Sequence, residues 1–203
     1  MIPLPSRDIE KLWSLYSSII EKIDDNKINE MIEDLGQSFV EHSYSLRTSE
    51  PFCGIGGILE YSLELAKTAK KLNESLSLGL DNKSLMRIAL ISEFGRIGKS
   101  SSILRFEENN SEWHKNNLGQ YYNWNKTCPK YKTNEMTLYH LSCYNVDLSW
   151  EELNAIMLLG DYKELKDFYR EDVAEFTQCL LSAQEWVLNS ERKRIKSAEV
   201  LPF

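Results

Sequence analysis

The chain lacks the cysteine arrangements of a structural metal site or a disulfide framework. Its four cysteines, Cys53, Cys128, Cys143 and Cys179, are scattered, and no CxxC pair or zinc-type Cys/His spacing occurs. The sequence also lacks a leader-like segment and any apolar run approaching the roughly 18 residues that cross a membrane. We therefore expect a cytoplasmic protein with reduced thiols, no metal and no membrane association.

The chain also lacks an excess of positive charge. Its formal net charge is −7, whereas a general nucleic-acid binder normally presents a basic face. One basic run spans 192–196, and we interpret it as a solvated last helical turn favoured by the helix dipole rather than as a binding tail. General nucleic-acid binding is therefore not expected.

What is present fits a folded domain, because 42% of the 203 residues are hydrophobic and 11% are aromatic. Apolar residues recur at helical spacing from Ile9 to Ile23, and a second short helix is predicted from Ile28 to Gly36. A loop over 38–52 is followed by a strongly apolar helix that opens after 54–57, and by a helix over about 83–95.

Aromatic residues around polar turn signals interrupt the helices after residue 104 and predict a two- or three-stranded hairpin. Helices resume near Asn134, and Ser149 with Glu152 forms a capping box for the next one. We predict a single domain over 1–203. Its parts are N-terminal helices (1–37), a core (38–190) with a β-hairpin insert at about 104–132, and a C-terminal tail (191–203).

The stretch Ala89 to Ser100 ends in Gly98-Lys99-Ser100 and is similar to the end of a phosphate-binding loop. That loop needs a glycine five positions before Gly98, where this chain has Glu93. A carboxylate there repels phosphate and does not permit the tight turn. The pattern therefore argues against nucleotide binding by such a loop.

Two motifs resemble the HD-domain metal-dependent phosphohydrolases, particularly small, often phage-encoded members with a β-hairpin insert. The family's Gly-Gly-Leu-Leu-Glu-His-Ser-Leu is matched by Gly56-Gly-Ile-Leu-Glu-Tyr-Ser-Leu63, and its Leu-Leu-His-Asp-Xaa-Gly-Lys by Leu90-Ile-Ser-Glu-Phe-Gly-Arg96. The resemblance covers roughly 38–190. It implies a mainly α fold, an HD-domain-like helical bundle with a small β-hairpin insert, and a phage-encoded protein in the host cytoplasm.

The family's metal ligands are histidines and aspartates that activate water against a phosphoester. By the resemblance, the corresponding positions of this chain carry Tyr61, Ser92, Glu93, Thr133, Leu159 and Gln184. Of these, only Glu93 is a good ligand for a divalent metal, so affinity should collapse. The resemblance thus implies a pseudoenzyme with no catalytic residues, no metal and no cofactor.

Several functions remain open for such a protein. We expect it to bind and modulate or inhibit a partner protein, from the host or the virus, with Trp113, Tyr122 and Trp124 of the insert as the candidate surface. The alternatives are a phosphohydrolase with remodelled ligands and a sensor or sponge for a nucleotide-like molecule. Arg47, Arg96 and Lys99 are the candidate anion contacts for the latter, although Arg96 and Lys99 could simply finish a helix.

The three histidines, His42, His114 and His140, do not coincide with the family's ligand positions. We expect surface or hydrogen-bonded structural roles for them, with His42 as the best candidate for an exception because it lies on the loop that leads to the former site. Cys53 has no identifiable base partner in the sequence, so a different nucleophilic centre is not predicted.

Overall fold

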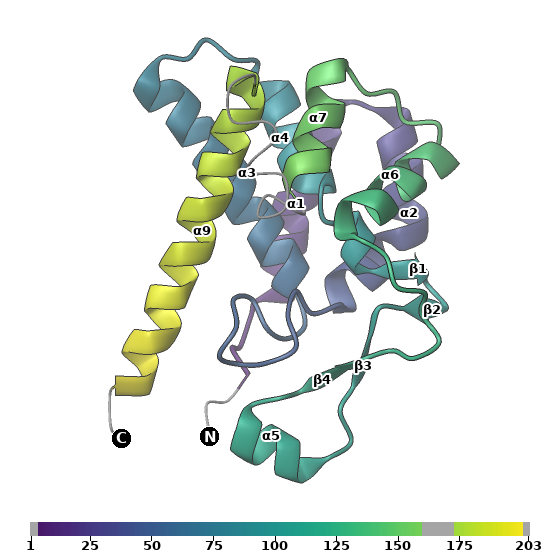
Figure 1. The fold of residues 1–203 in the computed structure, drawn as a ribbon. Helices are drawn as coiled ribbons and strands as arrows, with labels where there is room; N and C mark the ends of the chain where they lie inside the picture. Colours follow the sequence, from purple (N-terminus) through teal and green to yellow (C-terminus); the bar gives the residue numbers. More distant parts are fainter. Residues whose placement is uncertain (1–3, 160–172, 201–203) are drawn as a thin grey trace.

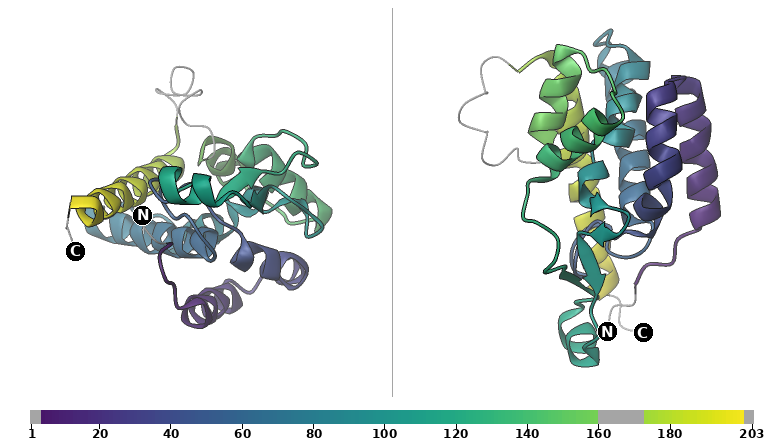
Figure 2. Two further views of the ribbon diagram at one scale, coloured as in Figure 1. Left: turned by 90° about the horizontal axis from the view of Figure 1, so that it is seen from below. Right: turned by 90° about the vertical axis from the view of Figure 1, so that its right-hand side faces the viewer.

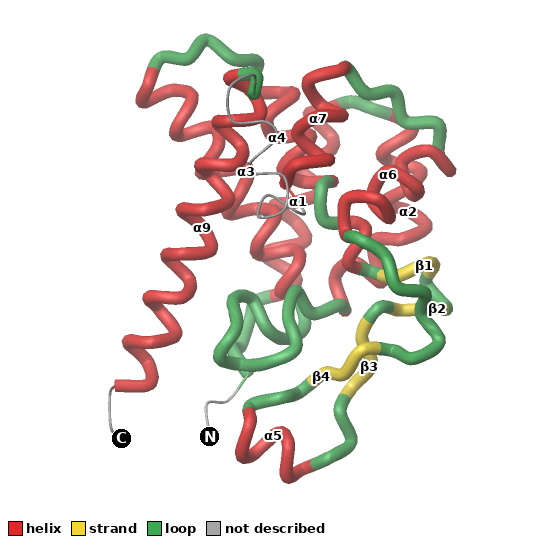
Figure 3. Tube along the Cα trace, in the orientation of Figure 1, coloured by secondary structure: helices red, strands yellow, loops and turns green. Residues whose placement is uncertain are grey.

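The computed structural model describes residues 4–159 and 173–200, and these are mainly helical (Figures 1 and 3). The helices are α1 (Ile9–Ile23), α2 (Asn26–Glu41), α3 (Gly57–Leu76), α4 (Asn82–Ile91), the 3-10 helix η1 (Phe94–Arg96), α5 (Glu112–Leu118), α6 (Thr133–Cys143), α7 (Trp150–Leu159) and α9 (Glu175–Val200). The strands are β1 (Gly98–Ser100), β2 (Ile103–Leu104), β3 (Phe106–Glu108) and β4 (Tyr122–Trp124). The prediction of a mainly α fold with a small β insert is confirmed.

The helices form a bundle around α3 and α4, which pack against each other (Figure 2). The α1–α2 pair covers one side of these two helices, and α6, α7 and α9 cover the other. The insert that contains β3, α5 and β4 projects from one end of the bundle, near the end of α9. One continuous core of buried apolar side chains joins these helices.

Aromatic contacts join the α1–α2 pair to η1, directly after α4. The Tyr16 ring lies 5.5 Å from Phe39, and Phe39 stacks on Phe94 with 4.4 Å between ring centroids. The buried Tyr16 hydroxyl donates to the Leu90 carbonyl oxygen at 3.2 Å, so it is not left without a partner. This contact fixes α1 against the segment that carries two of the predicted site residues.

The predicted end of the second helix at Gly36 is wrong, because α2 continues to Glu41 and includes part of the expected loop. Gly36 does not end the helix. A Cβ at this position would lie 2.8 Å from the Trp13 ring, so glycine allows α1 and α2 to approach closely. The extra turn buries Phe39 completely.

The helix predicted over 83–95 also ends earlier, at Ile91, and η1 follows it. The Thr137 hydroxyl of α6 donates to the Ser92 carbonyl oxygen at 2.7 Å and accepts from the Gly95 N–H at 2.9 Å. A Cβ at Gly95 would lie 2.0 Å from the Thr133 carbonyl oxygen, so only glycine lets η1 pack this closely against α6. The Thr137 side chain, which is distant in sequence, therefore binds the backbone just after α4 and helps to end this helix.

The predicted simple hairpin of the insert is only partly right. Strands β3 and β4 are antiparallel, with Glu107 opposite Asn123, but α5 lies between them and β1 pairs separately with β2. Ser111 caps α5 by accepting from the His114 N–H, and Gly119 ends it at a φ of 59°. The polar residues interpreted as turns of a hairpin therefore flank and end the helix α5.

Near the C-terminus, α9 continues to Val200, so the basic run 192–196 is helical, as interpreted from the sequence. Residues 201–203 of the predicted tail lie outside the described part of the chain. The capping box at α7 is confirmed, because the Ser149 N–H donates to Glu152 and the Glu152 N–H donates to the Ser149 hydroxyl.

Within residues 4–159 and 173–200, no helix is both long enough and apolar enough to cross a membrane.

Candidate functional site

Tyr61, Leu159 and Gln184 meet where α3, α7 and α9 come together. The Gln184 side-chain amide donates to the Tyr61 hydroxyl at 3.0 Å and to the Leu159 carbonyl oxygen at 2.8 Å. Tyr61 and Leu159 are both buried. Three of the six predicted positions are therefore joined by direct contacts, although they lie far apart in sequence.

A second group of contacts leads from Tyr61 to Glu93. The rings of Tyr61 and Tyr44 lie 4.5 Å apart, and the Arg96 guanidinium lies 3.8 Å above the Tyr44 ring. Arg96 also donates to the Tyr44 carbonyl oxygen at 3.3 Å and forms a short ion pair with the Glu93 carboxylate. Only 1% of the Glu93 side chain is exposed, so Arg96 provides the countercharge that its burial requires.

The pKa values of this cluster reflect its low exposure to water. Burial raises the pKa of Tyr44 to about 12 and raises that of Tyr61 well above its ordinary value. Burial is the largest single influence on Arg96 and opposes its charge, but the Glu93 carboxylate together with the Tyr44 and Tyr61 hydroxyls outweighs it, so the pKa of Arg96 is raised. The two phenols are therefore neutral, and neither is poised as a general base near neutral pH.

Ser92 and Thr133 complete the predicted set at the side where η1 meets α6. Ser92 directly precedes Glu93, and its buried hydroxyl has no hydrogen-bond partner among the described residues. The Thr133 hydroxyl accepts from Arg105 at 2.7 Å. The structure thus joins Tyr61, Leu159 and Gln184 directly and links Tyr61 to Glu93 through Tyr44 and Arg96, while Ser92 and Thr133 lie where η1 meets α6.

Arg105 links this region to the insert. Its guanidinium lies 4.9 Å from the Trp124 ring centroid and 5.2 Å from that of Tyr131. Burial, followed by the charge of Arg96, lowers the pKa of Arg105. Sequence reasoning missed this residue, because nothing in the local pattern of the insert marks an arginine that will be buried between aromatic rings.

The donor set of the cluster does not fit a divalent metal. Phenol, hydroxyl, amide and aliphatic groups surround one carboxylate, and that carboxylate is paired with Arg96. Among residues 4–159 and 173–200, no three His, Cys, Asp or Glu side chains are grouped so that they could hold a metal ion. What the arrangement does provide is a buried polar network that joins α3, α7, α9 and η1.

The candidate anion contacts do not share one environment. Arg96 is bound to Glu93, whereas Lys99 is exposed on β1. Arg47 is exposed on the loop after α2, where it forms an isolated antiparallel bridge with Gln120. Gly98-Lys99-Ser100 forms the strand β1, which differs from the loop and helix of a phosphate-binding loop.

The three candidate partner residues of the insert differ in exposure. Trp113 on α5 is 60% exposed and Trp124 on β4 is 55% exposed. Tyr122 is half-buried, and burial raises its pKa to about 12. The Phe106 and Trp124 rings pack edge to face, with 5.0 Å between their centroids. This contact holds the Trp124 ring in place, although more than half of the side chain stays exposed to solvent.

Two of the histidines are buried and hydrogen-bonded. The Phe106 N–H donates to His42 Nε2 at 3.1 Å, and His140 Nε2 lies 2.9 Å from the Gly98 carbonyl oxygen. Burial, with a contribution from the charge of Arg105, lowers the pKa of His42 to about 4, so its Nε2 is a stable acceptor. His114 Nδ1 contacts the Ser111 hydroxyl at 2.7 Å. These contacts agree with the structural roles expected from the sequence.

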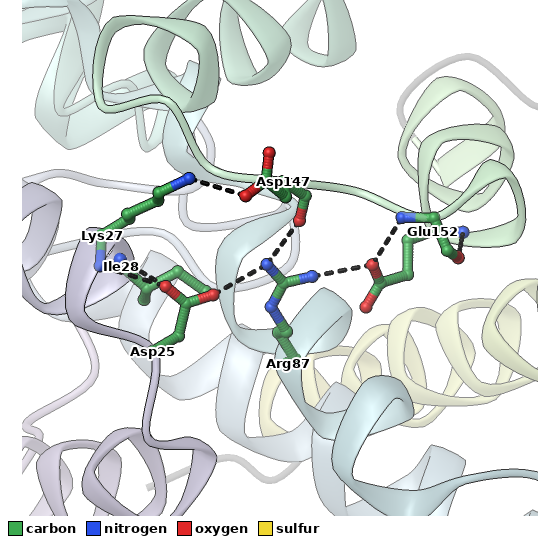
Figure 4. A network of polar contacts seen from close by, with 7 residues as sticks. Asp25, Lys27, Ile28, Arg87, Asp147 and Glu152 are labelled. Carbon is green, nitrogen blue, oxygen red and sulfur yellow. Dashed lines mark hydrogen bonds and ion pairs between the residues drawn. The ribbon is translucent and has the colours of Figure 1, made fainter.

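A polar network around Arg87 was not predicted (Figure 4). Its guanidinium donates to Glu152 at 2.7 Å, to Asp25 at 2.9 Å and to the Asp147 carbonyl oxygen at 2.7 Å. Asp25 and Glu152 also cap α2 and α7, so one arginine ties α4 to the starts of two other helices. The carboxylates are engaged within the fold, and we interpret the network as structural.

Comparisons with known proteins returned no matching family model, no matching curated protein and no matching solved structure.

Proposed function

We propose that this chain is a degenerate HD-domain-like protein that has no catalytic metal site and acts by binding a partner protein. The resemblance of Gly56 to Leu63 and Leu90 to Arg96 to the HD motifs provides the family assignment. The main structural support is that the polar groups at these positions are engaged within the fold: Gln184 binds Tyr61 and the Leu159 carbonyl, Glu93 pairs with Arg96, and Thr133 accepts from Arg105.

This cluster is poorly suited to hydrolysis. A metal-dependent phosphohydrolase needs open coordination positions and a bound water. Here the Gln184 amide bridges Tyr61 and the Leu159 backbone, and the Glu93 carboxylate is neutralised by Arg96. These residues stabilise the bundle, which favours a function on the outside of the molecule.

The insert is the surface that this proposal assigns to the partner. Trp113 and Trp124 are exposed on neighbouring elements of a projecting segment, although large aromatic side chains are normally buried. Tryptophan side chains are frequent anchors of protein interfaces, because they bury a large area at low entropic cost. The exposed aromatic character of the insert therefore supports partner binding.

Two measurements test the proposal together. Purified protein should not hydrolyse a panel of nucleotides and phosphodiesters in Mn²⁺, Mg²⁺, Ni²⁺ or Zn²⁺ beyond the level of Glu93→Gln. A photo-crosslinking residue at Trp113 or Trp124 should capture one defined protein from cells, and the same residue at exposed Trp186 on α9 should not.

Metal-dependent turnover that is lost in Glu93→Gln would restore the hydrolase alternative. If the partner is captured from position 186 and not from position 113 or 124, the partner surface lies on α9 and not on the insert. Tight binding of a nucleotide without turnover would favour the sensor alternative instead.

A further inference from the structure

A groove of about 450 Å³ runs between the end of α2 and the outer edge of β3. Glu41 and His42 form one wall, and Phe106, Glu107 and Glu108 form the other. Tyr122 also lines it, so the groove adjoins the aromatic surface of the insert. We call it the β3 groove.

The pairing of β3 with β4 leaves part of the β3 backbone directed away from β4. Bonds from Asn125 N–H to the Arg105 carbonyl oxygen and from Asn109 N–H to the Tyr121 carbonyl oxygen give the register. Residues 105, 107 and 109 therefore direct their backbone groups toward β4, and residues 106 and 108 direct theirs to the outer edge.

Among the described residues, one outward group of this edge, the Phe106 N–H, is bound by a side chain at the end of α2. His42 Nε2 accepts from the Phe106 N–H, which leaves the Phe106 carbonyl and both backbone groups of Glu108 directed at the outer edge. By contrast, the outer edge of β4 is covered by the loop after α2, because the Tyr122 N–H donates to the Leu46 carbonyl oxygen. Of the two edges of this sheet, β3 is thus the one that can accept another strand.

The β3 groove is negative. Glu41 and Glu107 form no ion pair with any cation in the described ranges, and Glu108 shares Lys115 with Glu112 at 3.3 and 3.4 Å. No lysine or arginine lines the groove among the described residues, and burial keeps the lining histidine neutral by lowering its pKa to about 4. The carboxyl end of α2 adds the negative end of a helix dipole.

Part of the groove lining is apolar. Leu4, Ile55, Leu104 and Phe106 contribute to it, and Ile55 is 54% exposed. A ligand with only positive charge would leave this apolar surface uncovered. A chain with alternating side chains would place basic groups at the carboxylates and apolar groups against the apolar lining residues.

We propose that the β3 groove binds an extended segment of a partner protein in which lysine or arginine alternates with apolar residues. The segment adds to β3 as a further strand, with backbone hydrogen bonds to Glu108 and charge contacts to Glu41 and Glu107. This inference rests on the proposed partner-binding function and names the chemistry of the partner's segment.

The test uses short fluorescein-labelled peptides and the full-length chain. A peptide of alternating lysine and valine should bind, as followed by fluorescence anisotropy, and binding should weaken as salt is raised. A glutamate–valine peptide of the same length should not bind. N-methylation of every second backbone nitrogen, on the side that faces β3, should abolish binding because it removes the strand hydrogen bonds.

Two matched variants separate this groove from general charge attraction. Glu41→Gln with Glu107→Gln should weaken binding by roughly tenfold. Glu10→Gln with Glu21→Gln, exposed positions on α1, changes the net charge equally and should leave binding unchanged. Hydrogen exchange of the Glu108 amide should slow when the peptide is bound.

The proposal is overturned if the lysine–valine peptide does not bind, if the N-methylated peptide binds equally well, or if both double variants weaken binding alike. Equal binding by a lysine–glycine peptide would show that the apolar side chains of the segment contribute nothing, which also contradicts it. Failure here with successful crosslinking from Trp124 would leave the proposed partner function intact. Failure of that crosslinking alone would count against the aromatic surface and not against the groove.

Discussion

Replacement of Arg96 by methionine is expected to destabilise the fold strongly. Methionine keeps much of the length of the side chain but removes the guanidinium that pairs with Glu93, donates to the Tyr44 carbonyl and lies above the Tyr44 ring. The Glu93 side chain is 1% exposed and that of Arg96 is 19% exposed, so water cannot readily replace the lost countercharge.

The size of the effect follows from this burial. Removing one partner of a buried ion pair costs about 3–5 kcal/mol, because the other charge stays buried without compensation. The cation–π contact with Tyr44 involves the same guanidinium, so its energy is coupled to that of the ion pair and the two are not additive. For a chain of this size, each kcal/mol lowers the melting temperature by roughly 2–4 °C. A fall of about 10 °C is therefore expected.

Urea denaturation of Arg96→Met, Arg47→Met and Glu93→Gln/Arg96→Met checks this reasoning. Exposed Arg47 should tolerate methionine within about 0.5 kcal/mol. The double variant should recover part of the loss, because the uncompensated charge is gone. A cost below about 1 kcal/mol for Arg96→Met would mean that the pair is solvated and that the cluster does not stabilise the interior.

Three further outcomes are expected. Gln184→Ala removes two hydrogen bonds, one to the buried Tyr61 hydroxyl and one to the Leu159 carbonyl oxygen, so unfolding in urea should show a loss of about 1–3 kcal/mol. Because burial and Arg105 lower the pKa of His42 from 6.5 to about 4, the unfolded chain binds a proton before the native state does. Stability should therefore fall as pH decreases from about 6.5 to about 4, by up to about 3 kcal/mol, and His42→Gln should show a flatter profile in urea melts. Trp124→Ala should weaken partner binding by about 2 kcal/mol or more, measured by calorimetry, while circular dichroism stays native; an unchanged affinity would remove this residue from the interface.

The mainly helical fold was predictable because apolar periodicity and capping signals are local. The run from Ile9 to Ile23 and the Ser149–Glu152 box mark helices without reference to the rest of the chain. The errors occurred where a distant partner decides the outcome. Gly36 accommodates Trp13 rather than ending α2, and Thr137 ends α4 from another helix.

The candidate site was predictable only in part, for the same reason. The motif resemblance identified Tyr61 and Gln184 as neighbours, and the structure joins them by a hydrogen bond. Tyr44 and Arg105 were missed, because their importance depends on long-range packing that no spacing rule encodes. The same applies to the β3 groove, whose walls come from α2 and from a strand far along the chain.

The most direct test of the central claim is the metal content of the purified protein, measured by mass spectrometry after expression with added Mn, Fe, Zn and Mg. We expect a content well below one ion per chain, identical in the wild type and in Glu93→Gln, with no change in melting temperature on adding a chelator. A wild-type chain that carries a stoichiometric metal, loses it in Glu93→Gln and melts at lower temperature with chelator would contradict the account, because a bound metal stabilises the native state by mass action.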